Sequence, residues 1–216
     1  MDNSVAIAVK SVQFGDTVSV KNLVESHKVS AQACDSDGCS LLHWAAINNR
    51  MAIAAILINN GARVSCPGGV LAEAPLHWAV RRGYGRMVDL LLKNGADISY
   101  KSDAGQDALT LACRLGLKDM VFLLLSRGAN PDALDNEGRS PFLYCLQNDP
   151  SLSIIRLLIQ FHADVTVQDE EGNNAFHILL SQGDNVEVIM LNDILMAGGV
   201  KKIFAKNRNG HNPFQV

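Results

Sequence analysis

The sequence predicts an all-α fold, a solenoid of stacked helix-turn-helix units joined by short β-hairpin loops. The first observation is a hexad of similar pattern that recurs along the chain, with successive starts 34, 33, 33 and 34 residues apart. The hexads SLLHWA, APLHWA, DALTLA, SPFLYC and NAFHIL start at Ser40, Ala74, Asp107, Ser140 and Asn174. Apolar runs that end at Gly-Ala, and turn segments rich in Asp and Gly, recur in phase with the hexads. Three signals in phase are typical of a repeat protein.

Each hexad predicts a short first helix. Pro75 and Pro141 stand in its first turn, where the missing N–H costs no hydrogen bond. A residue that tolerates the left-handed conformation follows at the end of four of these helices: Asn49, Gly83, Gly116 and Gly183. The second helix carries a leucine-rich run such as MVDLLLKNGA, from Met87 to Ala96, and a hairpin turn follows it.

The two ends of the chain depart from this pattern. We predict a degenerate capping repeat over residues 1–33, with a helix pair between Val5 and Ser26. Five repeats should occupy 34–208, with approximate bounds 34–66, 67–100, 101–133, 134–167 and 168–208. Residues 209–216 begin a further repeat and stop in its first helix. Because such a helix buries its apolar face poorly, we expect the sequence to be a fragment of a longer protein.

These signals together resemble the ankyrin repeat over nearly the whole chain. The composition agrees with a soluble binding module that faces a reducing compartment. A net charge of −3 does not indicate nucleic-acid binding. The sequence shows neither a membrane span nor a signal peptide. The five cysteines are scattered without a Cys-x-x-Cys motif, which argues against both a disulfide framework and a zinc site.

The histidines of the hexads are the first candidates for chemistry. His43, His77 and His177 share one position, but Thr110 and Leu143 occupy it in the other repeats. A catalytic residue would occur once and would need a nucleophile and an orienting acid. In ankyrin arrays this histidine hydrogen-bonds backbone across neighbouring units, which is the role we expect. We predict no catalytic residue, no cofactor and no metal in this segment.

A binding groove is predicted on the concave side, where hairpins and first helices face the partner. The position after the hexad histidine is held by Trp44, Trp78, Leu111, Tyr144 and Ile178. Leu111 and Ile178 should pack between repeats, whereas two adjacent tryptophans suggest a partly exposed aromatic groove. The predicted peptide-binding residues are Asn48, Trp78, Trp44, Ile47, Arg81, Arg82 and Tyr144. An extended, disordered segment would lie there, with Asn48 pairing its backbone. For Arg81 and Arg82 two interpretations stay open: they form a solvated face, or they contact an acidic peptide.

A closer resemblance is carried by LLHWAAINNR, the Gly-Gly loop and PLHWAVRRG. These segments look like the ankyrin domain of the DHHC protein S-acyltransferases, the huntingtin-interacting palmitoyltransferase group. The resemblance is strongest over residues 10–95 and extends to about residue 180. It implies a cytosolic domain that recruits substrates through Val/Ile-rich motifs ending in Gln-Pro. The groove residues of that family, an Asn and a Trp, correspond to Asn48 and Trp78.

The same resemblance implies membrane spans and a catalytic domain that are not in this sequence. The parent would use palmitoyl-CoA and structural zinc, in the Golgi or another internal membrane, and the segment itself would be a monomer. DALTLACRLG and SPFLYCLQN depart from the family pattern. The alternative is a stand-alone cytosolic ankyrin scaffold or inhibitor with no attached enzyme.

Overall fold

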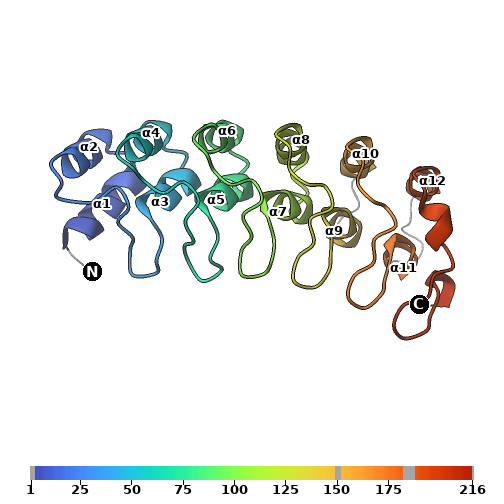
Figure 1. Cartoon of the computed structure of the whole chain (residues 1–216). Coiled ribbons are helices and arrows are strands. Elements are labelled where there is room, and N and C mark those ends of the chain that lie inside the picture. The colour runs from blue at the N-terminus through green and yellow to red at the C-terminus, as the bar shows by residue number, and fades with distance from the viewer. Residues whose placement is uncertain (1–2, 149–151, 182–187, 216) are drawn as a thin grey trace. The chain divides into compact units, whose positions relative to one another are not determined.

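The chain forms two units, Met1–Ala104 and Gly105–Val216, in a computed structural model that describes residues 3–148, 152–181 and 188–215. Each unit is a stack of helix pairs with loops along one edge (Figure 1). Among the described residues no extended strand is present, and only isolated bridges occur in the loops. The all-α prediction of stacked helix-turn-helix units is therefore confirmed.

The first unit contains three helix pairs. Their bounds are α1 Asn3–Phe14, α2 Thr17–Glu25, α3 Leu41–Ile47, α4 Met51–Asn59, α5 Pro75–Arg81 and α6 Gly85–Lys93. Helices α1, α3 and α5 pack side by side as an inner row, and α2, α4 and α6 form an outer row (Figure 1). The helix pair expected between Val5 and Ser26 is present as α1 and α2.

The second unit repeats this arrangement. Its helices are α7 Ala108–Arg114, α8 Lys118–Ser126, α9 Pro141–Asn148, α10 Leu152–Gln160, α11 Ala175–Ser181 and α12 Val188–Met196, followed by the 3₁₀ helices η2 Gly199–Lys202 and η3 Pro213–Gln215. Helices α7, α9 and α11 form its inner row. Arg156 of α10 and Asp193 of α12 join two outer helices through an ion pair of 2.7 Å.

The inner helices begin and end where the residue chemistry predicts. Ser40 caps α3 by accepting the His43 backbone N–H, Asp107 caps α7 in the same way, and Pro75 opens α5. Asn49 follows the end of α3 with a φ of 54°, which is the left-handed conformation expected at this position. Gly183 lies outside the described residues.

Two of the hexad histidines, His43 and His177, tie neighbouring repeats together. The Ser40 backbone N–H donates to His43 Nδ1 over 3.1 Å, so that Nε2 carries the proton and donates to the Glu73 carbonyl at 2.8 Å. His177 Nε2 lies 3.0 Å from the His211 carbonyl in an equivalent arrangement. Both imidazoles are buried. The structural role expected of His43 and His177 is confirmed.

Candidate peptide-binding groove

The predicted aromatic groove is present in the first unit. It is a hollow of about 350 Å³ between the loop that precedes α5 and the exposed ends of α3 and α5. The lining residues are Ile47, Gly68, Gly69, Val70, Leu71, Glu73, Trp78 and Arg81. Three of the predicted binding residues, Ile47, Trp78 and Arg81, therefore meet in one place.

Two indoles form the aromatic side of the groove. Trp78 contacts Trp44 edge to face, with ring centroids 5.8 Å apart, and His43 in the same way at 5.0 Å. The indole N–H of Trp44 donates to Asp35 Oδ2 over 2.8 Å. Within the described part of the chain the Trp78 indole N–H has no acceptor, and the ring is only partly buried. Trp78 thus offers both a flat apolar face and a free donor.

Two glycines allow the loop to approach the helices closely. A Cβ on Gly68 would lie 2.7 Å from the His43 ring, so a side chain at this position would collide with it. Gly69 has a φ of +70°, and its Cα faces Trp78 Cζ2, which a Cβ would meet at 3.6 Å. Gly68 and Glu73 close the loop with two backbone hydrogen bonds of 2.9 and 3.1 Å. The two glycines therefore let the backbone of this closed loop lie against His43 and Trp78.

The polar end of the groove consists of one ion pair. The Arg81 guanidinium binds the Glu73 carboxylate, which is almost completely buried. The backbone carbonyl of Glu73 accepts a hydrogen bond from His43 Nε2, so Glu73 is held through both its side chain and its backbone. Because a buried carboxylate without its partner is costly, Arg81 is needed to hold the loop as well as to line the groove.

Two side chains packed behind the groove lining, His43 and Cys39, are uncharged at neutral pH. Burial lowers the pKa of His43 below its usual 6.5, and the Ser40 N–H directed at Nδ1 disfavours a proton there. Burial likewise raises the pKa of Cys39, which lies beneath Gly69, to about 11. The groove therefore combines an apolar, neutral interior with a single charge pair at its end.

The other predicted residues occupy different places. Asn48 ends α3 and donates its side-chain N–H to the Trp44 carbonyl over 2.9 Å, beside the groove rather than in its lining. Arg82 is exposed at the end of α5 and does not line the groove. Leu111 and Ile178 are buried, as expected.

Tyr144 belongs to the second unit and is not part of this groove. Its ring is 3% exposed, and its hydroxyl donates to Asp135 Oδ2 over 2.6 Å and accepts from Gln106 Nε2 over 2.7 Å. Burial, followed by the hydrogen bond to Asp135, raises its pKa to about 12. The sequence pattern did not reveal that a carboxylate nine residues earlier would hold the hydroxyl in the interior.

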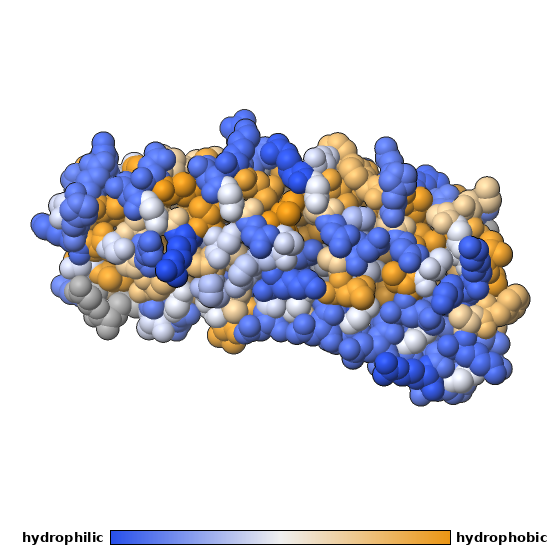
Figure 2. Space-filling model, viewed as in Figure 1, coloured by the Kyte–Doolittle hydropathy of each residue, from blue (hydrophilic) through white to orange (hydrophobic). Residues whose placement is uncertain are grey.

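The sequence prediction missed the apolar tip of the loop. Val70 is 95% exposed and Leu71 is 48% exposed, and both line the groove. Figure 2 shows an apolar spot at the tip of the loop before α5, among loop tips that are mostly hydrophilic. The available signal was the pair of apolar residues after Gly-Gly, in a loop that is longer than the repeat requires.

Within residues 3–148, 152–181 and 188–215, no helix combines the length and apolar character that crossing a membrane requires. Over the same residues no three His, Cys, Asp or Glu side chains come together in a way that could hold a metal ion.

Comparison with known proteins defines the class first. A family model for ankyrin repeats (3 copies) matches residues 6–102 and 76–169, and one for ankyrin repeats (many copies) matches 148–191. The chain belongs to the ankyrin-repeat family. The solved ankyrin-repeat domain of Bcl-3, described as a unique member of the IκB protein family, superposes with a TM-score of 0.83 at 25% identity, over 96% of this chain and 92% of that one.

The curated relatives are more specific. The chain is 34% identical to the putative palmitoyltransferase ZDHHC13 of Danio rerio, over 97% of its own length and 32% of the relative. It is 36% identical to the palmitoyltransferase ZDHHC17 of Rattus norvegicus (96% and 33%) and 31% identical to the palmitoyltransferase AKR1 of Lachancea kluyveri (94% and 28%). The chain thus resembles the ankyrin region of palmitoyltransferases and spans about a third of their length.

Proposed function

We propose that this chain recruits protein substrates by binding a short extended segment in the groove of its first unit. The observation that carries this proposal is Trp78, a partly exposed indole whose N–H has no acceptor among the described residues, beside a loop that two glycines bring close to it. A proline or branched aliphatic side chain fits the indole face, and the indole N–H suits a backbone carbonyl of an extended segment. The proposed ligand is a Val/Ile-containing motif ending in Gln-Pro.

The likeness to palmitoyltransferases supports a proposal about the parent protein in which this recruitment takes place. We propose that the parent is a membrane-bound protein S-palmitoyltransferase that uses palmitoyl-CoA and structural zinc, with this domain on the cytosolic face of the Golgi or another internal membrane. The domain acts as a monomer. Tethering a disordered client raises its local concentration near the acylation site without chemistry in the ankyrin repeats.

A second function is favoured by the likeness to the ankyrin-repeat domain of Bcl-3. The same architecture occurs there in a protein of another class, so a stand-alone scaffold or inhibitor is the alternative. The reading frame of the parent distinguishes the two. Several apolar spans with a Cys-rich Asp-His-His-Cys segment would support the transferase, and their absence from the full reading frame would support the scaffold.

The groove is tested by titrating a labelled peptide that contains Val, Ile and a terminal Gln-Pro. We expect Trp78→Ala to abolish binding and Trp78→Phe to weaken it at least about five-fold, with unchanged helical circular dichroism. Asn48→Ala should also weaken binding, because Asn48 ends the helix that carries Trp44. Arg86→Ala, an exposed change outside the groove lining, is the matched control. Equal affinity of Trp78→Phe and wild type would reject the groove.

A further inference from the structure

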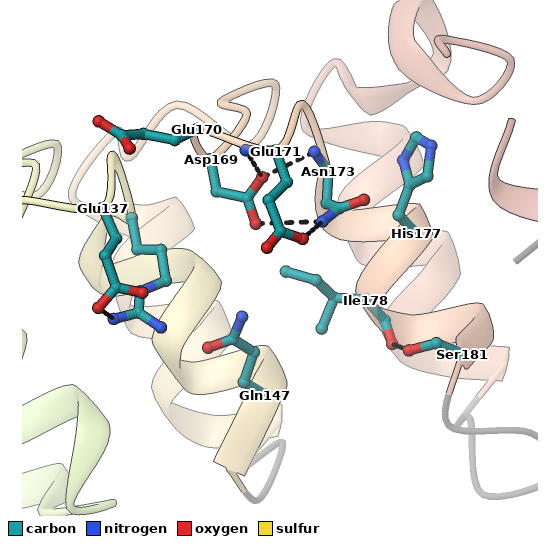
Figure 3. A pocket seen from close by; sticks show the side chains of 10 residues that line it. Glu137, Gln147, Asp169, Glu170, Glu171, Asn173, His177, Ile178 and Ser181 are labelled. Atoms are coloured by element: carbon teal, nitrogen blue, oxygen red, sulfur yellow. Dashed lines mark hydrogen bonds and ion pairs between the residues drawn. The ribbon is translucent and has the colours of Figure 1, made fainter. Parts of the chain in front are cut away.

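The second unit contains its own hollow, of about 440 Å³, at the exposed ends of α9 and α11 (Figure 3). Loop residues 169–173 form one wall, with Glu170 and Glu171 at the rim. Ile178 of α11 lies at its base, and Gln147 of α9 faces it from the other side (Figure 3). This hollow lies within one unit and shares no residue with the groove near Trp78.

The hollow lies in the same register of the repeat as that groove. Counted from the hexad start, Ile178 takes the position of Trp78, and Gln147 takes that of Ile47. Asn173 likewise takes the position of Glu73. Ile178 gives this hollow an apolar lining residue where the other groove has an indole. Two repeats of one chain thus present the same concave position with different side chains.

The charge of this hollow is strongly one-sided. Four carboxylates line it, from Glu137, Asp169, Glu170 and Glu171, against the single cation Arg139. That guanidinium is already engaged by Glu137 at 2.7 Å and by Asp135 at 3.4 Å. It also lies 4.6 Å above the ring of Tyr144. Arg139 therefore leaves the carboxylates on the opposite wall uncompensated.

The two rim carboxylates are free to meet a ligand. Asp169 is occupied with its own turn, where Oδ1 accepts the N–H groups of Glu171 at 3.0 Å and Asn173 at 2.8 Å. The Glu171 carboxylate accepts the side-chain N–H of Asn173, at 3.1 Å, and neither this carboxylate nor that of Glu170 has a cation partner among the described residues. The exposed carboxamide of Gln147 has no hydrogen-bond partner there either.

We propose that this hollow is a second docking site, which binds an extended peptide segment that carries lysine or arginine. Cationic side chains of the segment pair with Glu170 and Glu171, whose carboxylates point in different directions (Figure 3), and the aliphatic stem of the one at Glu171 lies over Ile178. Gln147 pairs with the backbone of the segment, since its amide can both donate and accept. A peptide fits better than a metal ion, because no three acidic side chains in the described residues converge on one point. The site is additional to the groove near Trp78.

The test uses the full chain and a fluorescein-labelled peptide with two lysines in a Gly, Ser and Val background. We expect saturable binding that weakens with salt. The pair Glu170→Gln and Glu171→Gln should weaken binding at least about three-fold, because each exposed charge pair contributes modestly. Gln147→Ala should also weaken it. The matched control pair is Glu25→Gln and Asp119→Asn, which removes the same charge from exposed positions elsewhere.

Several outcomes would overturn this second site. They are absence of binding to the wild type, equal weakening by the control pair, or displacement of the peptide by millimolar Mg²⁺ or Ca²⁺. The two sites are distinguished by measuring the binding of each peptide to the variant of the other site. Trp78→Phe should leave the lysine peptide bound, and the Glu170 and Glu171 variant should leave the Gln-Pro peptide bound. Loss of both peptides in either variant would argue against independent sites.

Discussion

Trp44 and Trp78 meet edge to face from two adjacent repeats, with their ring centroids 5.8 Å apart and their planes at 89°. The two rings differ in what holds them. The N–H of Trp44 is bound by Asp35, so that ring is oriented by the fold. The N–H of Trp78 has no acceptor among the described residues, and its ring lines the groove. One indole therefore supports the other, which is left available to a ligand.

The first prediction concerns this support. Trp44→Phe removes the hydrogen bond to Asp35 and reduces the area of the edge-to-face contact with Trp78. We expect peptide affinity to fall by about two- to ten-fold, because an aromatic pair contributes ~0.5–1.5 kcal/mol. Fluorescence titration measures the effect, and helicity should stay unchanged. A change smaller than two-fold would mean that Trp78 keeps its orientation without Trp44.

The second prediction concerns the loop glycine that faces His43. Gly68→Ala places a methyl group 2.7 Å from the imidazole, which must move away from the Glu73 carbonyl. We expect the first unit to lose about 1–3 kcal/mol of unfolding free energy, as overpacked sites do. Urea unfolding measures the loss. Val70→Ala, in the same loop but at an exposed side chain, should leave the midpoint unchanged.

The third prediction is a pH dependence. The pKa of His43 is lower in the folded chain than its usual 6.5 because the ring is buried, so folding favours the neutral imidazole. The unfolded chain then binds more protons, and stability rises with pH. This contribution is complete above pH 6.5 and is lost as the pH falls from there toward the lower folded value.

The pH dependence is measured by urea unfolding between pH 8 and pH 5. Because the chain contains five other histidines, the informative quantity is the difference between wild type and His43→Asn. The variant should be less stable at pH 8, and its deficit should shrink as the pH falls. A constant deficit across the range would contradict a depressed pKa for His43.

The fourth prediction separates Tyr144 from ligand binding. Tyr144→Phe removes the donor to Asp135 and the acceptor for Gln106 in a buried site. We expect a loss of ~1–3 kcal/mol of stability, because buried polar groups lose a partner. Thermal unfolding measures it. The affinity for the Gln-Pro peptide should be unchanged, and a weaker affinity would show that Tyr144 acts at the groove after all.

Much of the fold could be predicted from the sequence because its signals are local. Pro75 opens a helix and Asn49 ends one through the conformations that these residues themselves favour. His43 was placed in a structural role because other residue types replace it in sister repeats. The groove was predicted in part: Ile47, Trp78 and Arg81 line it, whereas Asn48 lies beside it.

The sequence by itself determined the repeat frame, the helix ends and the position of an aromatic surface, since each follows from spacing and backbone preference. Only the tertiary structure decided which side chain at a repeated position is buried. The Tyr144 hydroxyl is held in the interior by Asp135, whereas the Trp78 N–H has no acceptor in the described part of the chain and its ring lies beside the loop of Val70 and Leu71. The physical reason is that exposure depends on partners brought close by folding, which the repeat spacing does not encode.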